Sequence, residues 1–114
     1  MGNVPAPGRA ERIRLLNDGF RTTFSGGAVV LTVGVDALAA DLKAQVFSKV
    51  RTFAAFDSDC DPHGEHDFGS FELGGVTYFF KLDYYEPDMQ GGSEDPADPT
   101  KTARVLTIMR ADEY

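Results

Sequence analysis

The sequence contains one cysteine, no tryptophan and no apolar run long enough to cross a membrane. Because the lone Cys60 cannot form an internal disulfide, the chain is compatible with a reducing compartment. A transmembrane helix needs roughly 18 apolar residues in succession, so we expect no membrane association. Residues 1–8 are rich in Pro and Gly and lack the basic and then apolar pattern of a signal peptide. We therefore predict a flexible N-terminal segment and a cytoplasmic location.

Basic residues are nearly absent from one part of the chain. Residues 57–98 hold twelve acids against one base, Lys81, a net charge of −11, whereas the six acids and ten bases elsewhere give +4. A field of this sign repels phosphate backbones, so we expect no direct binding of nucleic acid. A protein partner with a basic surface matches the charge better. The alternative is that the acidity serves solubility alone.

Length and apolar spacing predict one α+β domain over residues 9–114. A chain of 114 residues can bury one hydrophobic core but is too short for two. The expected elements are helices over 9–24 and about 38–56, and strands over 28–33, 68–73, 76–85 and 102–110. This order, α-β-α-β-β-β, predicts two helices packed on one side of a four-stranded, mainly antiparallel sheet.

Apolar residues at three- and four-residue intervals define the first predicted helix. Its buried stripe would consist of Ile13, Leu16, Phe20 and Phe24. Arg21 falls among the polar positions. The Gly-rich residues 25–27 are expected to end the helix, because Gly tolerates left-handed backbone geometry.

The next segments predict a central strand and a second helix. Residues 28–33 form a nearly unbroken, β-branched apolar run, which predicts a strand inside the sheet and covered on both faces. Asp36 or Asp41 is expected to cap the helix that follows. The buried stripe of that helix would be Leu42, Val46, Val50 and Phe53.

The pair Gly74-Gly75 predicts a two-residue hairpin turn, and that turn fixes which side chains share a face. One face, expected to be core, holds Phe71, Leu73, Val76, Tyr78, Phe80, Leu82 and Tyr84. The opposite face is polar except for three aromatic residues, Phe68, Phe79 and Tyr85. Either another layer covers these three or they form a contact surface, for a partner or for a homodimer.

The connection over residues 86–101 is longer than most connections in a small domain, and such loops are often functional. It contains Pro87, Gly91, Gly92, Pro96 and Pro99. Four of its acidic residues are candidates for binding a basic partner: Glu86, Asp88, Glu94 and Asp95. Apolar anchors for the same partner would come from Phe68, Phe79 and Tyr85.

Both histidines lie in a short acidic segment that could hold a metal ion. Cys60, His63 and His66 are each separated by two residues, and Asp61 could complete a zinc site. The alternative is that no cofactor binds and that the histidines shape a tight turn. The spacing does not match the helical histidine pair of zinc hydrolases. Pro62 and Phe68 occupy positions where a calcium loop needs Gly and Glu, so the pattern disfavours an EF-hand.

The same segment could serve a hydrolase. His63 or His66 would act as general base, oriented by Glu65, Asp67 or Asp83. Cys60 and Ser70 are the candidate nucleophiles. No local pattern activates either nucleophile, so the sequence favours a protein that is not an enzyme.

Several long segments resemble a known bacterial family. They are residues 13–24, 61–69, 81–85, 95–99 and 104–109. Together they resemble the family called domain of unknown function 3768. The resemblance implies no established reaction, and it implies a setting in alphaproteobacteria and their mobile elements.

These observations favour a stoichiometric binding protein. The leading hypothesis is an acidic inhibitor, encoded by a mobile element, that blocks a nucleic-acid-targeting host defence protein in the manner of anti-CRISPR or anti-restriction proteins. The alternative is a metal-binding module or metal-dependent hydrolase centred on His63 and His66. A homodimer that packs its aromatic sheet faces together is the third hypothesis.

Overall fold

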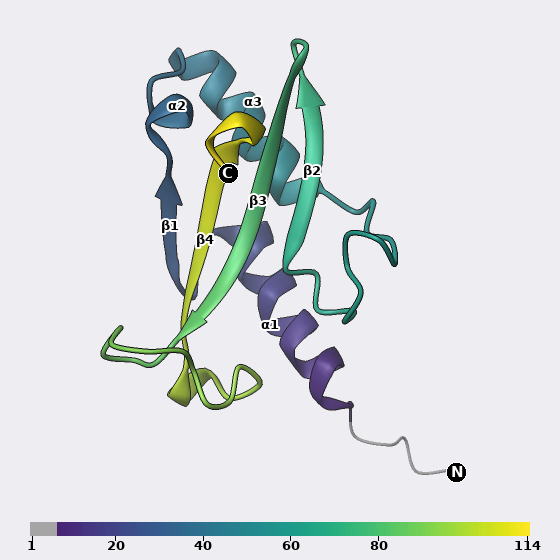
Figure 1. Ribbon diagram of the computed structural model, residues 1–114, viewed down its shortest axis with the longest axis vertical. Helices are drawn as coiled ribbons and strands as arrows, with labels where there is room; N and C mark the ends of the chain where they lie inside the picture. Colours follow the sequence, from purple (N-terminus) through teal and green to yellow (C-terminus); the bar gives the residue numbers. More distant parts are fainter. Residues whose placement is uncertain (1–6) are drawn as a thin grey trace.

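The computed structural model, which describes residues 7–114, places two long helices behind a four-stranded sheet (Figure 1). The helices are α1 (Arg9–Thr23) and α3 (Ala40–Thr52), and the strands are β1 (Ala28–Leu31), β2 (Phe68–Leu73), β3 (Val76–Tyr85) and β4 (Ala103–Arg110). A one-turn helix α2 (Val33–Asp36) follows β1, and 3-10 turns η1 (Pro99–Lys101) and η2 (Ala111–Glu113) flank β4. The expected flexible segment, apart from Pro7 and Gly8, lies outside the described residues.

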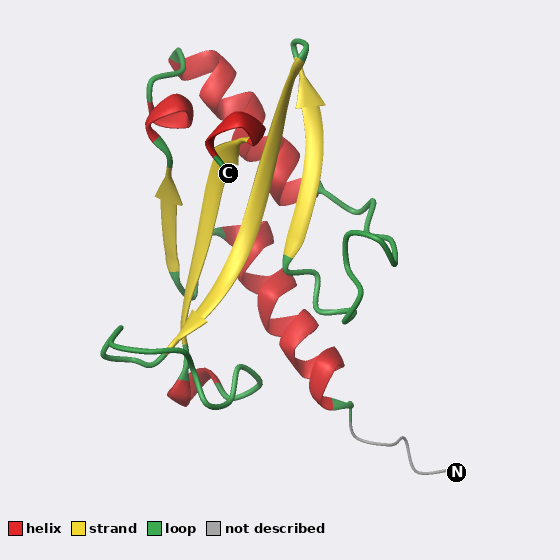
Figure 2. Cartoon of the chain, viewed as in Figure 1, coloured by secondary structure: helices red, strands yellow, loops and turns green. Residues whose placement is uncertain are grey.

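The strand order in the sheet is β1-β4-β3-β2, so the last strand lies between the first and the third. β3 pairs antiparallel with both β2 and β4, whereas β1 pairs parallel with β4. The predicted α+β class is therefore confirmed, and the sheet is mixed. Figure 2 shows the helices on one side of this sheet.

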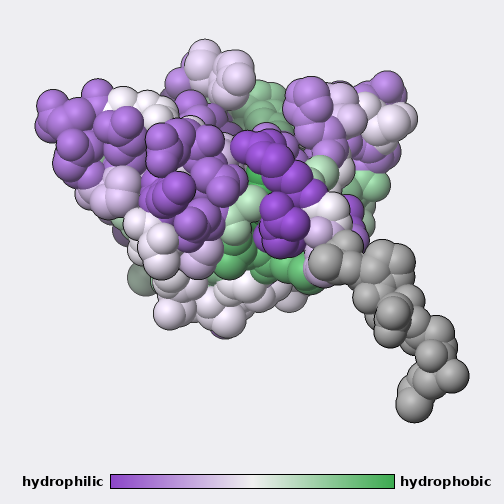
Figure 3. Space-filling view, turned by 90° about the horizontal axis from the view of Figure 1, so that it is seen from below, coloured by the Kyte–Doolittle hydropathy of each residue, from purple (hydrophilic) through white to green (hydrophobic). Residues whose placement is uncertain are grey.

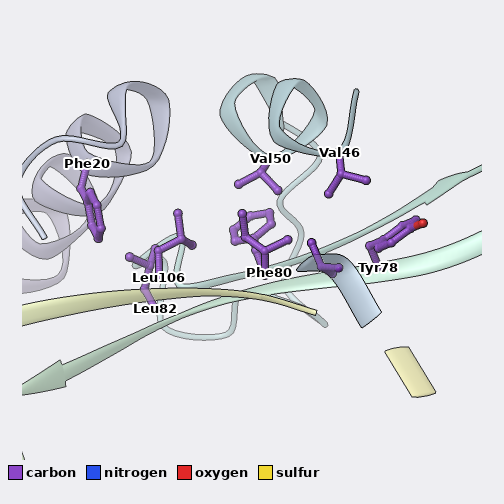
Figure 4. Close-up of a cluster of buried hydrophobic side chains, with 9 residues drawn as sticks. Phe20, Val46, Val50, Tyr78, Phe80, Leu82 and Leu106 are labelled. Carbon is purple, nitrogen blue, oxygen red and sulfur yellow. The ribbon is translucent and has the colours of Figure 1, made fainter. Parts of the chain in front are cut away.

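The core forms where α1 and α3 meet the sheet. Phe20, Val46 and Val50 point from the helices toward the strands (Figure 4). The strands contribute Tyr78, Phe80, Leu82, Leu106 and Ile108, all of them buried. Burying a side chain of this size contributes about 1.5–3 kcal/mol. The contact between the two helices and the sheet is therefore the main source of stability.

The hairpin and its register are confirmed. Gly74 and Gly75 have φ angles of 60° and 77°, which a two-residue turn of type I′ requires and other residues rarely adopt. Leu73 pairs with Val76 and Phe71 with Tyr78. Every residue predicted for the core face belongs to the core or packs against it.

The prediction that residues 28–33 form an interior strand was wrong. β1 pairs with β4 alone and lies at the edge of the sheet. Val29 and Leu31 face the core, but Val30 is 45% exposed, and Val33 already belongs to α2 and is 84% exposed. The apolar run arises because one set of alternate residues contacts the helices and the other set contributes to the open face of the sheet.

The helix ends also differ from the prediction. α1 ends before Phe24, which itself adopts the left-handed conformation at φ 59°, so residues 25–27 are not what closes the helix. Left-handed geometry costs a non-Gly residue about 1–2 kcal/mol. The Phe24 ring compensates for this cost by packing edge-on against Phe47 at 5.7 Å.

The predicted second helix is two separate helices, α2 and the shorter α3. Neither predicted aspartate caps it: Ala39 occupies the N-cap of α3 and makes no side-chain cap bond. Asp36 instead pairs with Lys43 at 3.4 Å, and Asp41 lies in the first turn. In that turn its negative charge interacts favourably with the helix dipole.

A glycine in β2 tests how tightly the core is packed. A Cβ at Gly69 would overlap the Phe80 ring and lie 2.9 Å from Phe53. We expect Gly69→Ala to lower the free energy of unfolding by about 1–3 kcal/mol, measured by urea denaturation. Gly19→Ala is the matched control: a Cβ there meets no atom within 4 Å, and Ala raises helix stability by about 0.5–1 kcal/mol. A Gly69→Ala variant as stable as the wild type would contradict tight packing.

Candidate functional site

Two acidic loops lie at the same end of the molecule. One connects α3 to β2 and lies beside the lower part of β2 in Figure 1, and the other connects β3 to β4 and lies below these strands. They carry ten of the twelve acids of residues 57–98, the other two being Glu72 and Asp83 on strands. Seen from below, hydrophilic residues cover much of this end (Figure 3). We call it the acidic end.

Few cations neutralise the acidic end. Glu94 pairs with Lys101 at 3.5 Å and Asp95 with Arg9 at 3.9 Å, both between partly exposed side chains. Within residues 7–114 no cationic side chain lies within 4 Å of the carboxylates of Asp57, Asp59, Glu86, Asp88 or Asp98. Of the four arginines in α1, only Arg9 reaches an acid of these loops.

Turn hydrogen bonds lower the pKa of two of these carboxylates. The backbone N–H groups of Asp59 and Cys60 donate to Asp57 Oδ1 at 3.0 and 2.9 Å. The N–H of Cys60, chiefly, holds the pKa of Asp57 below its ordinary value. Thr100 donates to Asp98 through its hydroxyl and its N–H, which lowers the pKa of Asp98 in the same way. Both groups carry full negative charge at neutral pH.

The loop between β3 and β4 forms a hollow of about 380 Å³ with three carboxylates in its wall. Its lining residues are Glu86, Pro87, Asp88, Glu94, Thr100 and Lys101. Backbone bonds brace the loop: Glu86 N–H donates to Gly91 at 2.7 Å and Ser93 N–H to Tyr84 at 3.1 Å. The carboxylates therefore project from a hydrogen-bonded scaffold.

The predicted partner-binding residues fall into two places. Glu86, Asp88 and Glu94 share the hollow, whereas Asp95 is half-buried and accepts a hydrogen bond from Ala97 N–H. Tyr85 ends β3, directly before Glu86. All three aromatics lie on the sheet face that α1 and α3 leave uncovered, where the rings of Phe68 and Phe79 are 5.1 Å apart.

His66 anchors the acidic loop between α3 and β2 to α1. Its Nδ1 lies 2.9 Å from Asp18 Oδ1, and its ring stacks on Phe56 with centroids 3.8 Å apart. Asp61 is 8% exposed, and its Oδ1 accepts the backbone N–H groups of Glu65 and His66. His63 is exposed. The His66 ring therefore contacts α1 and Phe56, while its backbone N–H belongs to the turn around Asp61.

The predicted metal ligands do not form a cluster. In the described part of the chain, no three His, Cys, Asp or Glu side chains lie close enough together to hold a metal ion. Cys60 is exposed, and desolvation followed by the charge of Asp57 raises the pKa of its thiol. Zinc binding through His63, His66, Asp61 and Cys60 stays a prediction, as does catalysis through Cys60 or Ser70.

Sequence reasoning missed a buried polar network that crosses from α1 to the sheet. Asn17 is fully buried; its Nδ2 donates to the Glu65 carbonyl and to Tyr84 Oη, and its Oδ1 accepts from Arg104 Nε at 2.9 Å. Tyr84 Oη donates to Glu65 Oε1 at 2.9 Å. Burial raises the pKa of Tyr84 strongly and lowers that of Arg104. The network joins α1, β3, β4 and one acidic loop.

Arg21 was predicted at the surface but is only 3% exposed. It donates to the Val50 carbonyl at 2.8 Å, pairs with Asp18 at 3.2 Å and lies over the rings of Phe56 and Phe80. The signal was present in the spacing, because Asn17 and Arg21 are four and eight residues beyond Ile13 and so share its helix face. Because its side chain is polar, Arg21 was predicted to be exposed although its position is buried.

Comparison with known families agrees with the resemblance seen in the sequence. A family model described as "Protein of unknown function (DUF3768)" matches residues 31–113. The chain belongs to this family. No curated protein matches it, and neither does a solved structure. The match includes the sheet from Leu31 onward, both acidic loops and Cys60, while α1 precedes it. Within residues 7–114 of the DUF3768 chain, no helix has the length and apolar character that crossing a bilayer requires.

We expect Asn17→Leu to destabilise the DUF3768 chain by about 3 kcal/mol, because it leaves the buried Arg104 Nε without an acceptor. Urea denaturation measures the loss, and faster hydrogen exchange of the Glu65 and His66 amides would show that the acidic loop has loosened. Leu15→Ala, on the same helix but 57% exposed, should change stability by no more than about 0.5 kcal/mol. Similar effects of both substitutions would count against the network.

Asp67 supplies a pH test. Burial, and then repulsion from Glu65 and Asp61, raises its pKa in the folded state. A carboxyl whose folded pKa is raised costs stability when ionised, and this cost disappears as pH falls below both pKa values. Asp67→Asn should therefore raise the melting temperature at about pH 7 and raise it less at about pH 3. A rise in melting temperature that is the same at both pH values would show that the effect has another cause.

Proposed function

We propose that this DUF3768 chain is a small acidic binding protein that binds a basic protein surface through its acidic end. The observation that carries the proposal is the concentration of ten acids in two loops at one end of the molecule. Asp57, Asp59, Glu86 and Asp88 have no cationic side chain within 4 Å in the described part of the chain. Such a surface attracts cationic partners and repels nucleic acid.

The hollow beside Glu86 suits an arginine or lysine side chain. Carboxylates bind a guanidinium through two parallel hydrogen bonds, which fixes orientation as well as affinity. Glu86 and Asp88 are free to do so, and Glu94 would exchange its bond with Lys101 for one with the partner.

The rigidity of both loops supports binding. One loop is fastened to α1 by Asn17 and His66, and the other by backbone bonds between Glu86 and Gly91 and between Ser93 and Tyr84. Association costs less free energy when the contacting groups are already ordered. The acidic end is preorganised in this sense.

The finer proposal is that the partner is a host defence protein and that the DUF3768 chain occludes its nucleic-acid groove, as anti-CRISPR and anti-restriction inhibitors do. Support comes from charge: a groove that holds phosphates is lined by Lys and Arg, which a carboxylate-rich surface complements. One inhibitor molecule would then displace nucleic acid by competition, with no chemical step.

Charge reversal tests the proposal. A triple variant, Glu86→Lys, Asp88→Lys and Glu94→Lys, should weaken binding to the partner by at least about tenfold, mainly through slower association that is sensitive to salt. Wild-type chain on a resin would first capture the partner from host lysate, and calorimetry with the purified partner would give the affinities. Addition of wild-type chain should also release bound nucleic acid from that partner.

The matched control changes net charge equally at the opposite end, through Asp41→Lys, Glu72→Lys and Asp112→Lys. These exposed residues lie on α3, β2 and η2. The control should bind within about threefold of wild type. Equal losses in both triple variants would show that only net charge matters, and unchanged affinity in the first would remove the proposal.

A further inference from the structure

One face of the sheet has no helical layer in the described part of the chain. Side chains alternate along β3, so that Phe80 and Leu82 face α1 and α3 whereas Phe79, Lys81, Asp83 and Tyr85 face away. The outward set is half-buried. Neighbouring strands add Phe68, Val30, Thr107, and the buried Val105 and Met109 to this face. We call it the open face; Figure 1 looks onto it.

The open face carries few charges, unlike the acidic end. On β2 and β3 they are the exposed Glu72 and the pair of Lys81 and Asp83, which lie 3.3 Å apart with side chains 40% and 36% exposed. At the margin of this face Tyr114 is 77% exposed, and its ring lies 6.4 Å from that of Phe68 and 5.7 Å from that of Phe79. Exposed aromatic residues beside a sheet face are typical of an interface.

The order of side chains along β3 is self-complementary. From Phe79 to Tyr85 the outward positions run aromatic, cation, anion, aromatic, with Leu82 at the midpoint. A two-fold axis through the level of Leu82 reverses this order in a second copy. Each aromatic then meets an aromatic, and Lys81 of each copy meets Asp83 of the other.

We propose that two copies of the chain pair through their open faces, with the two β3 strands antiparallel and the two-fold axis near Leu82. Closed two-fold dimers use the same patch on both copies, which a reversible pattern provides. Two sheets packed in this way lie about 10 Å apart with their strands within about 30° of each other. Four charges, two from each copy, form an alternating cluster at the axis.

The antiparallel arrangement also separates the two β3–β4 loops. This loop follows one end of β3, and the hairpin at Gly74-Gly75 lies at the other end. Reversing one copy puts its β3–β4 loop toward the hairpin end of its neighbour, whereas a parallel pairing would bring the acids of the two loops together. The dimer rests on the open face and not on the hollow beside Glu86, so it does not depend on the proposed function.

Charge exchange at the axis tests the dimer. Asp83→Lys gives a chain with two cations at the axis, and Lys81→Asp gives one with two anions, so each variant repels its own copy. Sedimentation equilibrium should show twice the chain mass for the wild type and dissociation at least about tenfold easier for each variant. An equimolar mixture of the two variants should regain the dimer mass, because opposite charges then meet at the axis.

The matched control exchanges the same charges in an ion pair at the acidic end. Glu94→Lys and Lys101→Asp alter the Glu94–Lys101 pair and should leave the dimer mass unchanged. Circular dichroism of every variant checks that it is folded. A wild-type chain of monomer mass at about 100 μM would overturn the proposal, and so would variants that fail to recover in the mixture. A wild-type dimer that both variants preserve would place the interface elsewhere.

Discussion

The buried amide of Asn17 is the constraint on which the acidic end depends. Its side chain contacts Arg104, Tyr84 and the Glu65 backbone together. A buried guanidinium without a carboxylate beside it is unfavourable unless its donors are satisfied, and Asn17 and the Pro96 carbonyl satisfy those of Arg104. The same amide holds one acidic loop against α1, and Arg104 holds the other through Pro96. Core packing and loop placement are therefore coupled.

The helix-facing side of the sheet, the open face and the loops differ in charge. The side of the sheet against α1 and α3 is apolar, and its buried polar groups lie at the boundary with the acidic loops, where Tyr84 and Arg104 end the apolar rows of β3 and β4. The open face holds a compensated pair, Lys81 and Asp83. Most of the negative charge lies on the loops, where water solvates it and backbone N–H groups stabilise it. The acidic loops and the open face thus differ in chemistry.

Local pattern predicted the parts of the fold that depend on neighbours in sequence. The turn at Gly74-Gly75 and strict alternation determined the register of β2 and β3, because a two-residue turn permits one pairing. The position of β1 depends on pairing with β4 more than seventy residues later, which no local signal contains. Arg21 was misplaced because polarity was given more weight than its helical spacing. At the site, the acidic loops were predicted, but the network behind them requires contacts between distant segments.

The two proposals, taken together, constrain the kind of partner. An antiparallel dimer would carry its two β3–β4 loops at opposite extremities, facing away from each other. Two linked sites raise affinity only where the partner presents two basic surfaces at matching separation, since otherwise the second site stays empty. A partner that is itself two-fold symmetric, or that repeats along a filament or a nucleic acid, meets this condition. A single monomeric partner with one basic groove would gain nothing from the dimer, and for such a partner the open face would serve stability alone.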